Sequence, residues 1–227
     1  MSLKTERILL RIDLTSGTIT RETLPEDFYR LYPGEKALAV YYFLNEMPQH
    51  TDAFDPQNLL ILANGLMTGS PVSTTTRYVA AGRSPLTNGI GSSEAGGYWG
   101  PELKKAGYEV IIITGRAEVP VYLWIKDEEV EIRSAQHLWG LPTADVQEII
   151  REELEDSRIR VLQTGVAGEN LVRYAGLTND LRHFNGRNGL GAVMGSKNLR
   201  AVAVRGSGRF EDTAHDQQGL RELARKL

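Results

Sequence analysis

The sequence predicts an α+β domain built from two similar halves. Residues 77–115 and residues 179–206 follow the same order: a polar, glycine-rich loop, then a short helix, then an apolar strand that ends on glycine. The two closing stretches read KKAGYEVIIITG and GSKNLRAVAVRG. Such self-similarity indicates an internal duplication. Two similar units allow packing about a pseudo-two-fold axis, with both loops presented to one ligand.

The hydrophobic pattern predicts the individual elements, because alternation is typical of strands and helical spacing of amphipathic helices. The expected strands are residues 7–13, 18–23, 59–63, 78–82, 89–93 (strand or loop), 108–114, 121–126, 130–133, 158–164 and 171–175. The expected helices are a turn after Pro25, residues 36–47, residues 96–105, and residues 144–154 with Thr143 as N-cap. Within residues 189–206 we expect a short helix followed by a strand. Each half is expected to have an Arg-Tyr pair at a strand start, Arg77–Tyr78 and Arg173–Tyr174.

The composition is that of an ordinary globular protein, and it excludes several classes of function. The 227 residues include no cysteine, so this chain by itself forms no disulfide and supplies no cysteine ligand to an iron–sulfur cluster. The formal net charge is −3 without a basic block, which argues against a nucleic-acid partner. No apolar run approaches the ~18 residues of a membrane span, and the start lacks a signal-peptide core. We therefore expect a cytoplasmic protein that binds neither nucleic acid nor membrane.

The stretch from Asn179 to Gly206 is the candidate ligand-binding segment. Its polar residues among the glycines are Arg182, His183, Asn185, Arg187 and Asn188. Glycines let a backbone approach an anion closely, and arginines supply charge and hydrogen-bond donors. Arg187 is the strongest candidate, because packing gives little reason for an arginine in so open a backbone. Arg77, beside the other glycine-rich loop, is a second candidate.

Two glycine-rich motifs have alternative interpretations. The sequence GLGAVMG at Gly189–Gly195 superficially resembles a dinucleotide fingerprint, which requires a strand directly before it and an acidic residue ~20 positions later. A polar loop precedes it here, so we favour glycines that allow close approach of a helix to another backbone or a ligand. The sequence GVAGEN at Gly165–Asn170 is interpreted equally well as a tight turn or as a ligand-facing loop.

Several segments carry a resemblance to one known family. They read NGLMTGSPVSTTTRY, GRSPLTNGIGSSEAGGYWGPELKKAGYEVIIITGRAEVPVYLWIKD, HLWG, GVAGENLVRYAGLTND and NGRNGLGAVMGSKNLRAVAVRG, and together they span most of residues 7–208. These segments are similar to the N-terminal domain of the tungsten-containing aldehyde:ferredoxin oxidoreductase family.

The resemblance implies a fold, a cofactor and a reaction. The fold is two mainly antiparallel sheets about a pseudo-two-fold axis, flanked by short helices. The cofactor is tungsten (or molybdenum) held by two pyranopterins, with magnesium bridging the pterin phosphates. In such an enzyme aldehydes are oxidised to carboxylic acids, and a [4Fe–4S] cluster in the C-terminal domains passes the electrons to ferredoxin. Because this chain has no cysteine, we expect the cluster only in the full-length protein and no activity from this fragment alone.

The resemblance assigns cofactor contacts in the first glycine-rich loop. Arg77 matches a pterin-contacting arginine, and Gly96 with Gly97 matches a backbone contact in an Asn-Ser-Gly-Gly pattern. This sequence has Glu94 and Ala95 in place of the Asn-Ser pair. The asparagine contributes to the magnesium and phosphate region, so Glu94 is the expected magnesium ligand on this side, since carboxylates ligate magnesium well.

The second loop supplies the remaining expected contacts. His183 and Phe184 stand where better-known members have Arg-Ala, and the alanine serves magnesium through its backbone carbonyl. The carbonyl of Phe184 is therefore the second expected magnesium ligand. Asn185, Gly186 and Arg187 keep the rest of the loop and are expected to contact the cofactor.

We expect residues 1–210 to form the tungstopterin-binding domain and residues 211–227 to begin a helical domain, truncated in mid-helix. The expected partners are ferredoxin, a small aldehyde substrate, the C-terminal domains of the same enzyme and a second copy in a homodimer. Two other hypotheses stay open at this point. One is a nucleotide (NADP)-binding enzyme domain, and the other is a non-catalytic scaffold domain of the same fold.

Overall fold

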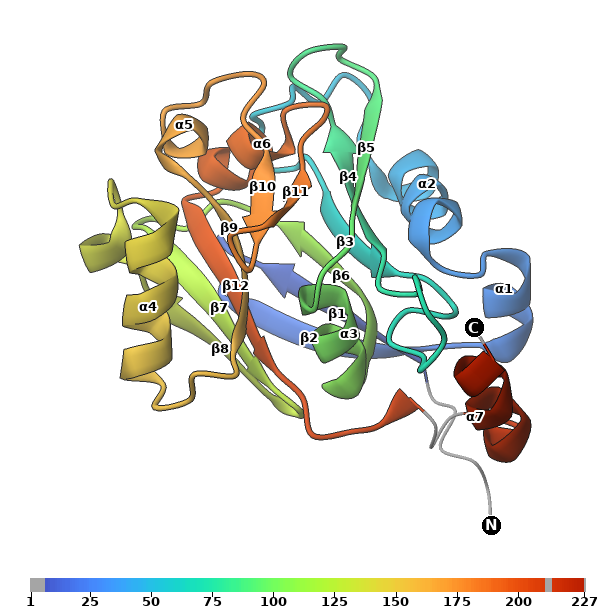
Figure 1. Ribbon diagram of the computed structural model, residues 1–227. Coiled ribbons are helices and arrows are strands. Elements are labelled where there is room, and N and C mark those ends of the chain that lie inside the picture. Colours follow the sequence, from blue (N-terminus) through green and yellow to red (C-terminus); the bar gives the residue numbers. More distant parts are fainter. Residues whose placement is uncertain (1–6, 211–213, 227) are drawn as a thin grey trace.

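Each half of the chain forms its own six-stranded sheet in the computed structural model, which describes residues 7–210 and 214–226 (Figure 1). The first sheet has the order β2-β1-β6-β3-β4-β5, with β1 (Arg7–Asp13), β2 (Thr18–Leu24), β3 (Leu60–Asn64), β4 (Tyr78–Arg83), β5 (Ile90–Ala95) and β6 (Tyr108–Thr114). The second has the order β11-β10-β9-β12-β7-β8, with β7 (Val121–Lys126), β8 (Glu129–Ser134), β9 (Arg160–Thr164), β10 (Leu177–Asn179), β11 (His183–Asn185) and β12 (Leu199–Arg205).

The two sheets have the same connectivity, which confirms the predicted duplicated α+β fold. Read in reverse, the second order places β7 to β12 where the first sheet has β1 to β6. Among the described residues, each sheet has one parallel pair, between its first and last strand in chain order (β1 with β6, β7 with β12), and its other pairs are antiparallel. The duplication therefore extends beyond the two glycine-rich stretches to the whole of both halves.

The helices form layers around and between the sheets (Figure 1). Outside the first sheet lie α1 (Glu26–Leu31) and α2 (Glu35–Glu46), and outside the second lie η1 (Gln136–Leu138) and α4 (Thr143–Glu153). Between the sheets lie α3 (Trp99–Lys105) and α6 (Leu190–Ser196), which share one large apolar core with both inner faces. The two remaining helices are α5 (Val166–Glu169) and α7 (Gln217–Lys226). Strand alternation makes these layers possible, because neighbouring residues such as Leu9 and Leu10 face opposite cores.

Several details of the expected secondary structure are wrong, among them GVAGEN, which forms helix α5, and the expected polar loop after Asn179, which contains strand β11. Residues 171–175 form turns, because Ala175 donates its N–H to the Val172 carbonyl at 2.8 Å, and the strand begins only at Leu177. The counterpart of Tyr78 in the second half is therefore Leu177, since each starts the equivalent strand, and not Tyr174. Thr143 is the first helical residue of α4 rather than its N-cap, which is Pro142. The expected start of the final helical domain at residues 211–213 lies outside the described residues.

The glycines of GLGAVMG serve close packing of backbones, as we favoured. A Cβ on Gly195 would collide with the carbonyl of Gly168 in α5, and a Cβ on Gly191 would collide with the carbonyl of Gly176. All seven residues of α6 are buried. An antiparallel hairpin, β10 with β11, precedes the helix. A dinucleotide site needs a strand leading directly into an accessible helix N-terminus, so this context argues against the NADP hypothesis.

Both parallel strand pairs contain a register irregularity, and each irregularity buries one charged residue. The register skips Glu109 between β1 and β6, and it skips Arg200 between β7 and β12. Glu109 forms an ion pair with Lys104 at 3.0 Å, and Arg200 forms one with Glu169 at 2.8 Å. Each charge is thus paired inside the protein, as buried charges require. The positions are equivalent in the duplication, although the charges have opposite signs.

Lys197, directly after α6, connects the two halves. Its ammonium is fully buried and donates hydrogen bonds to the carbonyls of Pro56 at 3.0 Å and Gly115 at 3.2 Å. Burial, and to a smaller extent the nearby Arg116 guanidinium, lower the pKa of Lys197 to about 7. Lys197 is therefore held at the contact between the halves without an ion pair to any carboxylate in the part of the chain that the structure describes.

The first prediction concerns the contact between α5 and α6. Replacing Gly195→Ala should destabilise the protein by about 1–3 kcal/mol, because the added methyl overpacks against the Gly168 backbone. The matched control is Gly89→Ala, where a Cβ meets only the Thr87 hydroxyl oxygen at 3.8 Å. Urea unfolding of both variants measures the difference. Equal stability of the two variants would contradict the packing role of Gly195.

The second prediction concerns pH. An unfolded lysine keeps its proton up to about pH 10.5, whereas folded Lys197 loses it near pH 7. Between these values the folded state binds fewer protons, so the contribution of Lys197 to stability rises with pH. Relative to Lys197→Met, the wild type should gain about 2 kcal/mol from pH 7 to pH 9, with a slope that approaches about 1.4 kcal/mol per pH unit once folded Lys197 is fully deprotonated. Urea unfolding at both pH values, with exposed Lys126→Met as control, measures this gain. Parallel pH profiles for wild type and Lys197→Met would refute it.

Candidate functional site

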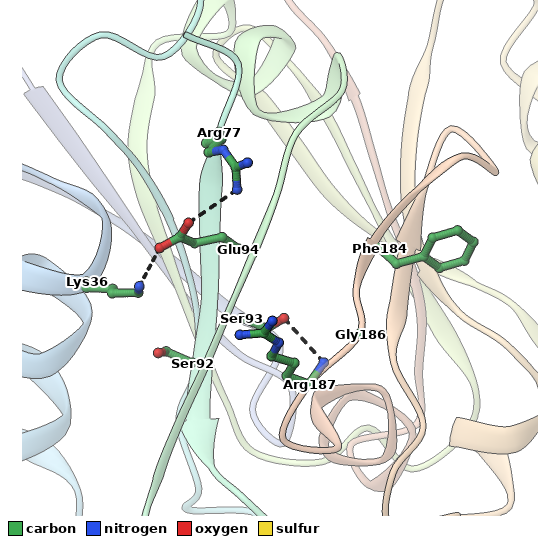
Figure 2. A pocket seen from close by; sticks show the side chains of 8 residues that line it. All are labelled: Lys36, Arg77, Ser92, Ser93, Glu94, Phe184, Gly186 and Arg187. Carbon is green, nitrogen blue, oxygen red and sulfur yellow. Dashed lines mark hydrogen bonds and ion pairs between the residues drawn. The ribbon is translucent and has the colours of Figure 1, made fainter. Parts of the chain in front are cut away.

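A groove of about 460 Å³ lies where an edge of the first sheet faces an edge of the second (Figure 2). Strand β5 is one edge and β11 is the other. The groove is lined by Lys36, Arg77, Ser92, Ser93, Glu94, Phe184, Gly186 and Arg187. Five of these were expected at the site from the sequence: Arg77, Glu94, Phe184, Gly186 and Arg187. The groove is therefore made by both halves together.

The positions of the charged side chains follow from the strand register. Arg77 directly precedes β4, and the pairing of Tyr78 with Ala95 and of Val79 with Glu94 brings Arg77 beside Glu94. Arg187 follows the end of β11 by two residues, after Gly186. A Cβ at Gly186 would meet nothing closer than 3.9 Å, so the chain is open here, as the sequence indicated.

Glu94 is the only carboxylate among the residues that line the groove, and it is bound by two cations. The Lys36 ammonium contacts its Oε1, and an Arg77 guanidinium nitrogen lies 3.3 Å from its Oε2. The hydrogen bond from Lys36, together with the two positive charges, lowers the pKa of Glu94. Burial, and then the charge of Glu94, raises the pKa of neighbouring Glu35. Glu94 is therefore ionised at neutral pH.

Arg187 gives the groove an excess of positive charge. Its backbone N–H donates to the Ser93 hydroxyl at 3.3 Å, while its exposed guanidinium has no hydrogen bond or ion pair within residues 7–210 and 214–226. Together with Lys36 and Arg77 it makes three cations against the one carboxylate of the lining. Guanidinium groups match the geometry of phosphate oxygens, so the groove suits a phosphorylated anion.

A polar seam fixes the two walls of the groove relative to each other. We use this term for Tyr78, Ser93, Asn179 and Asn185. The buried Tyr78 hydroxyl donates to Asn185 Oδ1 at 2.8 Å and accepts from Asn179 Nδ2 at 3.0 Å. Asn185 Nδ2 donates to the Ser93 carbonyl at 2.7 Å. Asn185 was expected to contact the cofactor, but its amide faces the first half instead of the groove.

Three further expected site residues lie beside the seam and do not line the groove. The Gly96 carbonyl accepts a hydrogen bond from Asn179 Nδ2 at 3.1 Å. Gly97 has φ +95°, and a Cβ there would lie 2.6 Å from Cδ2 of His183. These contacts place Gly96, Gly97 and His183 at the junction of the halves. Ala95 is buried in the core between the sheets. The Phe184 ring is 59% exposed and points away from Glu94 (Figure 2).

Sequence reasoning missed Lys36, Ser92 and Ser93. Lys36 lies in the first turn of α2, far along the chain from both glycine-rich loops. Gly34, with φ +82°, forms a bridge to Gly65 at the end of β3, which holds the start of α2 against the groove. The one sequence signal for Lys36 is a glycine directly before a helix whose first turn is charged. This pattern is too common in proteins to identify a binding site.

The groove fits the phosphate part of the expected cofactor better than its magnesium ion. Three cations and open backbone suit phosphate oxygens. For the metal, the described residues contain no cluster of three or more His, Cys, Asp or Glu side chains that could hold an ion. Both oxygens of Glu94 are already engaged by cations.

The fold and the groove define a class of domain: a duplicated α+β unit with a cationic groove at the junction of its halves. The chain belongs to the aldehyde ferredoxin oxidoreductase family and matches its N-terminal domain over residues 9–206. It is 44% identical to the tungsten-containing aldehyde ferredoxin oxidoreductase of Pyrococcus abyssi, over 96% of this chain and 36% of that protein. It is also 35% identical to an aliphatic sulfonate oxidoreductase WOR-like subunit of Pyrococcus furiosus, over 96% of this chain and 37% of that protein.

A solved structure has the same fold. The active-site complex BamBC of benzoyl coenzyme A reductase, in complex with 1,5 dienoyl-CoA, superposes with a TM-score of 0.87 at 40% identity. The match covers 89% of this chain and 31% of that one. The chain thus spans about a third of the length of the relatives it matches. Among the described residues, no helix is long and apolar enough to cross a membrane.

The third prediction tests the polar seam. Tyr78→Phe removes one hydroxyl and leaves two buried amides, Asn179 and Asn185, without that partner, which should cost about 1–3 kcal/mol for each amide left unsatisfied. The matched control is Tyr174→Phe, because Tyr174 is 75% exposed. Urea unfolding of the two variants gives the comparison. If Tyr78→Phe is as stable as Tyr174→Phe, the hydroxyl does not hold the halves together.

Proposed function

We propose that this chain is the cofactor-binding domain of a tungsten (or molybdenum) enzyme that oxidises aldehydes to carboxylic acids. The observation that carries the proposal is the meeting of the two glycine-rich segments at one groove with three cations and one carboxylate. Family membership supports the same function, as do the names of the relatives. The group to be held is a bis-pyranopterin, whose phosphates match the charge of the groove.

The residues of this chain bind and orient the cofactor. Arg77 and Arg187 project from opposite halves and contact phosphate oxygens, so that one ligand is held from both sides. The polar seam keeps the two arginines at a constant separation, which preserves the orientation of the bound group. The bound metal supplies the two-electron oxidation of the aldehyde, a chemistry that the side chains of this domain lack.

The remaining steps belong to the rest of the full-length enzyme. This chain has no cysteine, so the cysteine ligands of a [4Fe–4S] cluster, whose chemistry would be electron transfer to ferredoxin, would come from the C-terminal domains. The small aldehyde binds mainly in those domains. Relatives named for aldehyde, aliphatic sulfonate and glyceraldehyde-3-phosphate share this domain or part of it, which supports a substrate choice made elsewhere.

The proposed domain has a defined extent and belongs to a larger assembly. Residues 1–210 form the cofactor-binding domain, and α7, which buries none of its side chains here, starts the next domain. A homodimer of the full-length enzyme stays a prediction. Magnesium bound by Glu94 and the Phe184 carbonyl also stays a prediction.

Elemental analysis of the full-length protein tests the function. Protein purified from its own host, grown with ample tungstate, should contain tungsten or molybdenum together with pterin. Absence of both metals would favour the non-catalytic scaffold. Saturable micromolar binding of NADP(H), followed by fluorescence, would favour the nucleotide-binding alternative.

The fourth prediction concerns Arg187. Arg187→Ala in the full-length enzyme should lower tungsten and pterin content, because a phosphate loses a charge-assisted contact of ~1.5–3 kcal/mol. That energy corresponds to roughly 10- to 150-fold weaker binding. The matched control is Arg173→Ala, an exposed arginine that does not line the groove. Metal and pterin per protein are measured by mass spectrometry and pterin fluorescence. Unchanged content in Arg187→Ala would rule out a phosphate contact of that size.

A further inference from the structure

Lys36 contacts Glu94, the carboxylate that the family resemblance predicts to bind magnesium. Its ammonium contacts Glu94 Oε1, and Arg77 lies on Oε2, so each oxygen of this carboxylate already faces a positive charge (Figure 2). A lysine ammonium is a compact positive charge with three hydrogen-bond donors. One donor is used on Glu94, and two are left for oxygens of a ligand in the groove.

No other carboxylate of the lining is available to a metal. Magnesium in phosphate sites is usually bound by one or two carboxylates together with phosphates and waters. Glu35 is the neighbouring carboxylate, but it does not line the groove. Its Oε1 lies 2.6 Å from the Cβ position of Gly65, so the carboxylate is directed at that backbone. A magnesium ion would therefore have to displace Lys36 from Glu94.

The fold holds Lys36 in place independently of Glu94. The bridge between Gly34 and Gly65 attaches the start of α2 to the end of β3. The next turn of the helix is anchored by Leu38 and Ala39, which are fully buried in the outer core of the first sheet. The backbone of Lys36 is therefore fixed beside the groove by a rigid element, within reach of Glu94.

We propose that the Lys36 ammonium, paired with Glu94, replaces the divalent cation at this site and binds a phosphate of the ligand directly. The groove then binds phosphate without magnesium. This inference rests on the proposed function to the extent that the groove binds a phosphorylated ligand. It differs from the expectation drawn from the family resemblance, in which magnesium bridges the phosphates.

The test is phosphate binding to full-length protein prepared without cofactor from tungsten-depleted cells. Inorganic phosphate is titrated by calorimetry in metal-free buffer and again with magnesium chloride. Wild type should bind with the same affinity in both buffers. Lys36→Met should bind at least about tenfold more weakly in metal-free buffer, since a charge-assisted contact is lost. Lys36→Arg should keep metal-independent binding, and exposed Lys126→Met should match wild type.

Two outcomes overturn the inference alone. One is phosphate binding by wild type only when magnesium is present, and the other is unchanged affinity in Lys36→Met. If wild type binds no phosphate in either buffer, the anion-binding groove itself is refuted and the proposed function fails with it.

A second variant distinguishes direct contact between Lys36 and phosphate from a lysine that only neutralises the charge of Glu94. In a Glu94→Gln background the carboxylate charge is gone, so a lysine that only neutralises it has no remaining role. If Lys36 contacts phosphate, adding Lys36→Met to Glu94→Gln still weakens binding several-fold. Equal affinities of Glu94→Gln and the double variant would overturn the proposal.

Discussion

The Tyr78 hydroxyl, held between the amides of Asn179 and Asn185, is the contact on which the site depends. Each sheet is built from one half of the chain, so no strand pairing among the described residues joins the halves. The junction relies on the shared apolar core, on the indole of Trp99 donating to the Val202 carbonyl at 2.9 Å, and on the polar seam. Apolar packing favours contact without direction, whereas hydrogen bonds in a buried seam set one relative position. That position determines the distance between Arg77 and Arg187.

The duplication explains the architecture, and its broken symmetry explains the site. Equivalent register irregularities bury Glu109 in one half and Arg200 in the other, so the halves share a backbone pattern while their charges diverge. The groove shows the same divergence. The first half contributes Lys36, Arg77 and Glu94, whereas the second contributes Arg187 as its one charged residue. An anion held at the junction therefore meets a compensated charge cluster on one side and an uncompensated guanidinium on the other.

Local patterns predicted most of the strands, because alternation and continuous apolar runs such as YEVIIIT directly reflect burial. They failed at residues 171–175, which form turns and not a strand, with the Ala175 carbonyl accepting a hydrogen bond from Gly191 of α6. The local patterns also did not distinguish the roles of two polar residues within one loop. Asn185 and Arg187 looked alike as polar residues among glycines, yet Asn185 is buried in the seam and Arg187 is exposed in the groove. Burial in the seam, which depends on partners from the first half, distinguishes these two residues and has no signal in the loop sequence itself.

The sequence by itself determined the duplicated α+β class, the family, and five of the eight residues that line the groove. These features are local, because glycine spacing, apolar periodicity and motif identity are properties of short segments. Tertiary structure alone decided that His183 lies against Gly97 and does not line the groove, and that Lys36 pairs with Glu94. Lys36 and Glu94 lie far apart in the chain, and their contact depends on how α2 packs on the first sheet. Charge compensation between distant residues has no local signature, so only the folded chain shows it.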